Sequence, residues 1–325
     1  MEIGGYFELE KNSGNLYHKS AIKLNSGRNC IRALIRNREI KKIYLPYFIC
    51  NAVVEACYLE KCEINYYFLN QNLRPQNDIL NFDFKSDYLY LVNYAGLLTV
   101  SEIENYKKQY QNVILDNAQA FFMYPIAGID TIYSCRKYFG VPDGAYLYAS
   151  IDFTEKYDQD YSYCRMTHIL GRYDLGAEKF YDKFVKNEEQ FSNMPIRYMS
   201  KLTDNMMRGI DYNSSMNRRT NNYCLIYNAL RKWNNLILPE KILGAFSYPL
   251  MVDNAAKIRR KLAEEKIFIP QYWKEVLDRV PEGRIEYQYA KNILWIPCDQ
   301  RYSKIEIDYL IDRLIKILKL GDRKI

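Results

Sequence analysis

The feature that most constrains the fold is an alternation between two kinds of segment, which runs from residue 24 to about residue 150. Short runs of β-branched and aromatic residues alternate with segments of helical composition, which is the pattern of βαβ units. The alternation predicts an α/β fold with a mostly parallel sheet. The expected strands are Lys42–Pro46, Glu63–Leu69, Tyr88–Tyr94, Asn112–Asp116, Asp130–Ser134 and Gly144–Ala149.

The intervening segments predict helices, among them Arg28–Arg38, Ile49–Glu60 and Ser101–Tyr110. In the last of these, Ser101 precedes Glu104 by the spacing of a capping box. After residue 150 the segments become more helical and more charged. We expect helices at Met216–Trp233, Asp253–Glu265 and Ser303–Leu318, with Ser303 and Glu306 in a second capping box and a strand at Ile267–Pro270.

A chain of 325 residues is longer than one compact core usually serves. The change of pattern along the chain therefore predicts two domains. We expect a large domain over residues 1–205 and a smaller α+β domain over residues 206–325.

The composition gives no indication of a membrane, secreted, metal-binding or nucleic-acid-binding protein. No run approaches the roughly 18 to 20 apolar residues that span a bilayer, and the first residues, MEIGGYFELEK, do not resemble a signal peptide. We expect a cytoplasmic protein without a membrane segment. The eight cysteines form no C-x-x-C pair and there are two histidines, so no metal site is expected. The net charge of +7 is spread along the chain and no nucleic-acid-binding motif accompanies it.

The stretch from residue 112 to residue 147 carries the most chemical information. One apolar run delivers Asp116 at its carboxyl end, and the next delivers Ser134 and Lys137. Ligands of open α/β sheets sit at the carboxyl ends of strands. An acid and a lysine on neighbouring strands could therefore face the same ligand, although each alone would also suit a turn or a solvated surface.

Pyridoxal 5'-phosphate (PLP) chemistry needs such a pair. An amine forms the Schiff base and later moves protons, and a carboxylate keeps the pyridine nitrogen protonated. Near the amino terminus, Asn25, Ser26 and Gly27 precede an amphipathic helix. The start of a helix offers unpaired amides and the positive end of a dipole, which suit a phosphate, although the same residues would equally serve as a simple helix cap.

The segment around Asp116 and Lys137 resembles the PLP-dependent nucleotide-sugar aminotransferases of the DegT/StrS type. Their Asp-x-x-Gln element is matched by Asp116 and Gln119, and the serine before their Schiff-base lysine is matched by Ser134, though closer to Lys137 than is usual. Gly140 and Gly144 match the glycine-rich turn that follows. The resemblance implies that Lys137 carries PLP, Asp116 binds the pyridine nitrogen, Gln119 lies near the ring hydroxyl and Ser134 touches the phosphate.

Other segments extend the resemblance over nearly the whole chain. The family's Ser-Gly-Thr-Ala element is matched by Ser26 and Gly27, with Arg28 in place of a hydroxyl residue, so the backbone of Gly27 and Arg28 is expected to bind phosphate. Tyr47 or Phe48 is expected to stack on the cofactor, with Cys50 as the alternative. Asn93 stands where the family commonly has histidine and could line the site.

The resemblance implies an aspartate-aminotransferase-like fold (PLP fold type I) and a homodimer. It implies transfer of an amino group from an amino acid, such as glutamate, to a keto sugar nucleotide. Arg301, before the last helix, could clamp a substrate carboxylate. A PLP-dependent lyase or decarboxylase would use the same Asp116 and Lys137, and a non-catalytic PLP-binding protein of the same fold remains an alternative. A sugar dehydratase is disfavoured because those relatives replace the Schiff-base lysine.

Overall fold

A large, mostly parallel sheet forms the centre of the protein. The computed structural model describes residues 3–76, 79–153 and 155–322. In this part, seven strands pair in the order β1-β7-β6-β5-β4-β2-β3. Their bounds are β1 (Ile22–Leu24), β2 (Lys42–Pro46), β3 (Glu63–Tyr67), β4 (Tyr88–Val92), β5 (Val113–Asp116), β6 (Asp130–Ser134) and β7 (Ala145–Tyr148). The pairs from β6 to β3 are parallel, and β7 is antiparallel to both of its neighbours, which confirms the predicted α/β class.

The six strands expected before residue 150 all form, with shorter bounds in four of them. The ladders of β3 and β4 end at Tyr67 and Val92, two residues before the expected ends. The chain turns after β4, where Ala95 has a φ of 51°. Strand β1 has three residues and was not expected, because so short a run shows no periodicity of its own.

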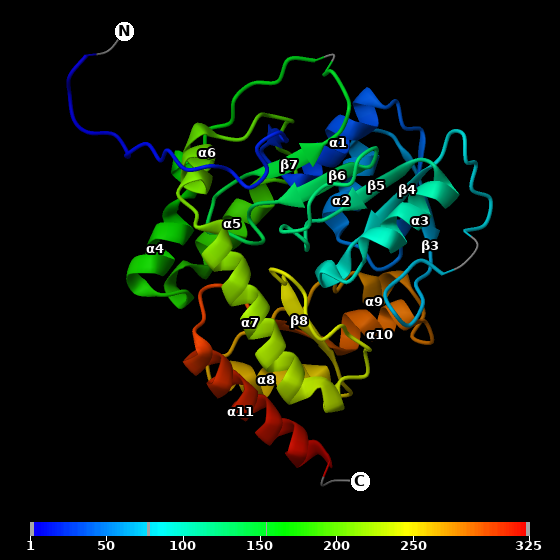
Figure 1. The fold of residues 1–325 in the computed structure, drawn as a ribbon, viewed down its shortest axis with the longest axis vertical. Helices are drawn as coiled ribbons and strands as arrows, with labels where there is room; N and C mark the ends of the chain where they lie inside the picture. Colours follow the sequence, from blue (N-terminus) through cyan, green and yellow to red (C-terminus); the bar gives the residue numbers. More distant parts are fainter. Residues whose placement is uncertain (1–2, 77–78, 154, 323–325) are drawn as a thin grey trace.

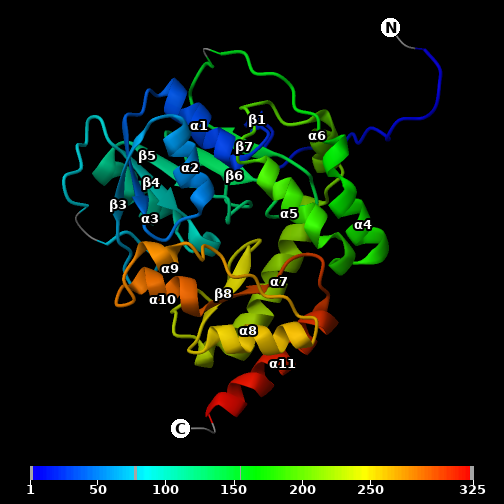
Figure 2. The ribbon, with the colours of Figure 1, turned by 180° about the vertical axis from the view of Figure 1, so that it is seen from behind.

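Helices cover both faces of the large sheet. Figures 1 and 2 show α1 (Gly27–Asn37) and α2 (Asn51–Leu59) on one face and α3 (Val100–Tyr110) on the other. Helix α3 begins one residue earlier than expected, and its capping box is formed by Thr99 and Glu102. The predicted box of Ser101 and Glu104 is therefore wrong: both pairs have the required spacing, and the structure selects the earlier one.

The second half of the chain builds a smaller layer beside the large sheet (Figure 1). Strands β8 (Ser247–Met251) and β9 (Ile293–Pro297) pair antiparallel. The helices of this half are α4 (Thr167–Leu175), α5 (Tyr181–Gln190), α6 (Lys201–Arg208), α7 (Tyr212–Leu230), α8 (Ala255–Glu264), α9 (Val276–Arg279), α10 (Ile285–Asn292) and α11 (Lys304–Asp322). The small sheet that was expected is present, but its strands differ from the predicted one.

The strand predicted at Ile267–Pro270 is wrong, because this segment is irregular and joins no ladder in the described part of the chain. It follows α8 through Lys266, whose φ is 60°. Ile269 is 4% exposed whereas Phe268 is 66% exposed. Its apolar pattern therefore reflects the buried Ile269 and the partly buried Ile267, which anchor an irregular connection to the core.

One hydrophobic cluster joins the two sheets. Phe48, after β2, lies with its ring centroid 4.6 Å from that of Trp273 in the second half of the chain. Because the cluster is continuous, it packs the two halves of the chain against each other. The domain boundary expected between residues 205 and 206 stays a prediction. Of the helices that the structure describes, none has the length and apolar character to cross a membrane.

Candidate active site

Three strands bring their carboxyl ends to one edge of the large sheet. Leu24 of β1 and Ser134 of β6 both pair with Ala145 of β7. Because β7 is antiparallel to each of them, β1 and β6 run in the same direction. Asp116 of β5 pairs with Ile132 of β6, so it lies at this edge as well. The segments after Leu24, Asp116 and Ser134 therefore meet here, as the sequence predicted for Asp116 and Lys137.

Gly144 ties the start of α1 to the lysine turn. Its amide donates to the carbonyl of Asn25 over 2.8 Å, and its carbonyl accepts from the amide of Cys135 over 3.1 Å. The φ of Gly144 is 110°, and a Cβ there would lie 2.9 Å from Cγ2 of Thr203. Glycine is required at this position on both counts.

The amino terminus of α1 presents backbone amides to the edge. Ser26 caps the helix by accepting from the amide of Asn29 over 3.2 Å, which leaves the amides of Gly27 and Arg28 ahead of the capped turn. A Cβ on Gly27 would meet no atom closer than Cγ2 of Ile132 at 4.0 Å. The guanidinium of Arg28 is ion-paired with Glu55 at 2.9 Å.

Lys137 is exposed and its amine makes no hydrogen bond or ion pair with the described residues. It lies in the turn that follows β6, close to the thiol of Cys50. Burial raises the pKa of Cys50, and the charges of Lys137 and Arg28 oppose that rise. Cys50 is thus a residue of the LPYFIC segment whose thiol feels the charge of the lysine.

Asp116 is held by two donors while part of it stays exposed. The hydroxyl of Tyr90, on the neighbouring strand β4, donates to Oδ2 over 3.0 Å. The amide of Ala118 donates to Oδ1 over 2.8 Å. Each carboxylate oxygen can accept a second bond, so the group retains acceptor capacity for a ligand.

Gln119 and Asn93 are bound to the turn after β4. Oε1 of Gln119 accepts from the amide of Ala95 over 2.8 Å, which leaves its amide nitrogen as a donor. Asn93 is 0% exposed; its Nδ2 donates to Asn117 and its Oδ1 accepts from the amide of Leu98. Asn93 therefore stabilises the turn, and this geometry does not support a lining role for its side chain.

Tyr47 and Phe48 pack away from the edge. Tyr47 stacks on Tyr66 and Phe68, with centroid distances of 4.8 and 4.5 Å, toward the outermost strand β3. Phe48 is 0% exposed. Neither ring is free to stack on a cofactor in this conformation, so the geometry favours the alternative, Cys50.

Ser134 is placed where it could contact a phosphate, whereas Arg301, the candidate for a substrate carboxylate, is already paired. Ser134 ends β6 and is partly exposed at the site edge. Arg301 binds Asp299 through two bonds, of 2.7 and 2.9 Å, so a substrate carboxylate would compete with that pair. The adjacent Gln300 donates to the carbonyl of Tyr138 over 2.8 Å, which brings this turn close to the lysine turn.

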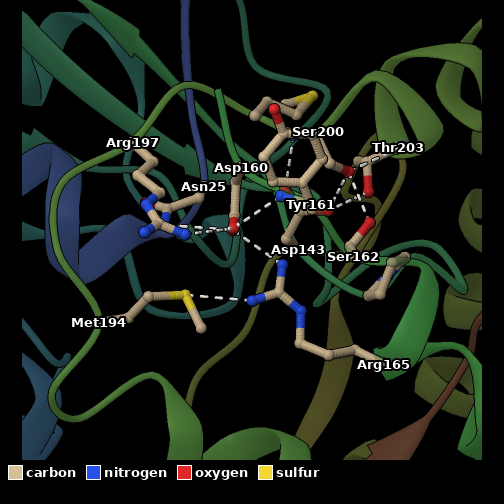
Figure 3. A network of polar contacts seen from close by, with 12 residues as sticks. Asn25, Asp143, Asp160, Tyr161, Ser162, Arg165, Met194, Arg197, Ser200 and Thr203 are labelled. Atoms are coloured by element: carbon tan, nitrogen blue, oxygen red, sulfur yellow. Dashed lines mark hydrogen bonds and ion pairs between the residues drawn. The ribbon is translucent and has the colours of Figure 1, made fainter. Parts of the chain in front are cut away.

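Two buried carboxylates, Asp143 and Asp160, are the centres of a polar network next to Asn25 (Figure 3). Asp143, next to Gly144, accepts from the amide and the hydroxyl of Ser200 at 2.8 and 2.7 Å. Asp160 accepts from Arg165 at 2.8 Å and from Asn25 at 3.3 Å. These bonds fix the segments on either side of the α1 terminus.

Sequence reasoning missed these supporting residues, together with Tyr90 and Arg219. Asp143 lies in a Pro-Asp-Gly turn, a local signal that could have drawn attention to it. Tyr90 and Arg219 carry no local signal, because one lies inside an apolar strand and the other inside a helix.

The residues at the edge fit a phosphorylated pyridine aldehyde. The amine of Lys137, without a partner among the described residues, suits an aldehyde. The carboxylate of Asp116 suits a ring nitrogen, and the open space beside Gly27 at a helix start suits a phosphate. Within the described residues, no group of three or more His, Cys, Asp or Glu side chains could hold a metal ion.

The fold is that of the PLP fold type I aminotransferases, and its structural neighbours are sugar aminotransferases of the DegT/DnrJ/EryC1/StrS type. An aminotransferase from Psychrobacter cryohalolentis matches with a TM-score of 0.68 and 13% identity, over 92% of this chain and 87% of that one. A DegT/DnrJ/EryC1/StrS aminotransferase from Brucella abortus matches with a TM-score of 0.65 and 15% identity, over 91% and 85%.

A third structure shows a cofactor in this fold. NtdA from Bacillus subtilis, with bound pyridoxamine phosphate (PMP), matches with a TM-score of 0.65 and 14% identity, over 92% of this chain and 73% of that one. No protein-family model matches the sequence, and no curated protein matches it significantly. At these identities the likeness shows the fold.

Proposed function

We propose that this protein is a PLP-dependent aminotransferase that moves an amino group from an amino acid, with glutamate as the expected donor, to a keto sugar nucleotide. The observation that carries the proposal is the meeting of Lys137, Asp116 and the start of α1 at one sheet edge. The fold of sugar aminotransferases supports the choice of reaction and substrate.

Lys137 supplies the amine that holds the cofactor and moves protons. When bound, PLP supplies an electron sink for the charge that develops on the α-carbon of the amino acid. The Lys137 amine has no competing ion pair in the described chain, so its Nζ is free to take a proton from that carbon and deliver it elsewhere.

Asp116 and the start of α1 orient the cofactor. The Asp116 carboxylate would hold a proton on the pyridine nitrogen, and its fixed orientation favours one position of the ring. The amides of Gly27 and Arg28, with the hydroxyl of Ser134, would bind the phosphate at the positive end of the helix dipole. Cys50 lies beside the lysine and would border the ring.

The proposal includes a homodimer. Asn213 and Asn217, near the start of α7, are exposed in the single chain and are our candidates for a side chain that reaches the phosphate of a partner subunit. Light scattering at micromolar concentration should find a dimer, and a fully active monomer would contradict this part of the proposal.

Two half-reactions test the function. Glutamate should convert the PLP form of the purified protein to the PMP form, seen as loss of its visible absorption band. A keto sugar nucleotide should then restore the band.

Any other result of the two half-reactions would favour a different function. If no amino acid changes the spectrum, the protein binds PLP without transamination. If amino acids release CO₂ or an eliminated group instead, it is a decarboxylase or a lyase. If only simple keto acids restore the band, the nucleotide-sugar part of the proposal is wrong.

A further inference from the structure

We propose that Tyr90 is a positioning residue for Asp116, the carboxylate that we assign to the pyridine nitrogen. This inference rests on the proposed function and extends it. Its starting point is the bond of 3.0 Å from the Tyr90 hydroxyl to Oδ2 of Asp116.

Strand pairing and burial hold Tyr90 in one position. It lies in the middle of β4, where it pairs with Ile114 of β5, and it is 1% exposed. The hydroxyl of Tyr67 donates to its carbonyl over 2.8 Å. The phenol therefore reaches Asp116 from the buried interior, out of contact with solvent.

The phenol keeps the proton that it donates to pH values above those at which an ordinary tyrosine ionises. Burial, and then the charge of Asp116, raise the pKa of Tyr90 well above its ordinary value. A hydrogen bond from a neutral hydroxyl to a carboxylate is stronger than one between neutral groups. Tyr90 thus donates to Asp116 in the absence of any ligand.

Tyr90 and the Ala118 amide together fix the plane of the carboxylate. One donor binds Oδ2 and the other binds Oδ1, so rotation of the group would break both bonds. The remaining acceptor positions are therefore presented in one orientation before the cofactor arrives. Pre-organisation of this kind lowers the entropy that binding must remove.

Tyr90→Phe removes the hydroxyl and keeps the ring, which makes it the informative substitution. We expect the dissociation constant of PLP, measured by titrating the apoprotein, to rise about tenfold, equivalent to about 1.4 kcal/mol. If Tyr90 acts through Asp116, the same substitution in an Asp116→Ala background should change that constant by less than about twofold.

A spectroscopic measurement tests the role of Tyr90 without relying on the affinity for PLP. In Tyr90→Phe the pH midpoint of the visible band of bound PLP should move to higher pH, because a less firmly protonated ring withdraws fewer electrons from the nitrogen joined to Lys137. Tyr44→Phe is the matched control. Tyr44 is a strand tyrosine, 2% exposed, whose hydroxyl donates to the carbonyl of Asn81 over 2.7 Å, and its loss should change neither reading.

The outcomes separate this inference from the proposed function. If the unmodified protein forms no complex with PLP, both are wrong. If it does, but Tyr90→Phe matches the unmodified protein, Tyr90 has no positioning role. Equal losses of affinity with Asp116 intact and in the Asp116→Ala background, with an unmoved pH midpoint, would show that the phenol acts on the fold and not through the carboxylate.

Discussion

The guanidinium of Arg219 donates to the backbone carbonyl of Tyr138 over 3.1 Å, so that helix α7 holds the turn that carries Lys137. Arg219 also donates to the carbonyl of Ala245 at 3.0 Å and to Gln300 at 2.6 Å. Its guanidinium carbon lies 4.3 Å from the centroid of the Tyr138 ring. One side chain thus connects α7, the segments that flank the small sheet, and the lysine turn.

Arg219→Ala should lower the free energy of unfolding by about 2 to 4 kcal/mol, because it removes the charged donor that the buried carbonyls of Tyr138 and Ala245 share and the partner of Gln300. Urea denaturation measures the change. Arg218→Ala is the control, since Arg218 is the exposed neighbour on the same helix and its loss should cost less than about 0.5 kcal/mol. Similar small losses in both variants would show that Arg219 does not hold the turn.

Gly144→Ala should destabilise the protein by about 1 to 3 kcal/mol, because alanine is strained at positive φ and its Cβ would press on Thr203. Gly140→Ala, in the same turn, is the matched control. There the nearest atom to an added Cβ lies 3.7 Å away and the φ is not positive. Thermal unfolding compares the two, and an equal melting temperature would contradict the requirement for glycine at position 144.

Lys137→Arg should abolish covalent attachment of PLP while keeping a positive charge at the site. The test is borohydride reduction of the PLP-loaded protein followed by peptide mapping, which should place the pyridoxyl group on Lys137 in the unmodified chain. Lys108→Arg, on the exposed side of α3, should leave the label in place. A label on any other lysine would overturn the assignment of Lys137.

The sequence predicted that our two central candidates would share one sheet edge because each follows a local pattern that indicates a strand. Asp116 and Lys137 come directly after apolar runs that form β5 and β6, and parallel strands bring their carboxyl ends to the same edge. The α1 terminus was readable for a similar reason, since Ser26 and Gly27 precede an amphipathic helix. Each of these positions is set by the few residues around it, so the local sequence is enough to predict it.

The supporting contacts could not be predicted because they join residues that are distant in sequence. Tyr90 and Asp116 are separated by 26 positions, and Arg219 and Tyr138 by 81. Nothing in an apolar strand indicates that one tyrosine will meet a carboxylate. The choice between Phe48 and Cys50 likewise depended on where the chain turns after β2, which tertiary packing against Trp273 decides.

The last prediction concerns His18, whose ring is packed among aromatic side chains. It is 0% exposed, its Nε2 lies 2.8 Å from the carbonyl of Phe121, and its ring centroid lies 4.1 Å from that of Tyr133. Burial lowers the pKa of His18 from 6.5 to about 4. The folded protein therefore holds this imidazole neutral under conditions in which the unfolded chain would protonate it.

The sign of the pH dependence follows from that difference. As the pH falls through 6.5, the unfolded chain binds a proton at His18 before the folded protein does, so stability is lost between about pH 6.5 and about pH 4. Between about pH 7 and about pH 5 the expected loss is about 2 kcal/mol, measurable by urea denaturation. His18→Gln keeps a donor for the Phe121 carbonyl but cannot titrate, so its stability should fall by about 2 kcal/mol less over the same interval. Parallel curves for the two proteins would show that His18 is protonated equally in both states.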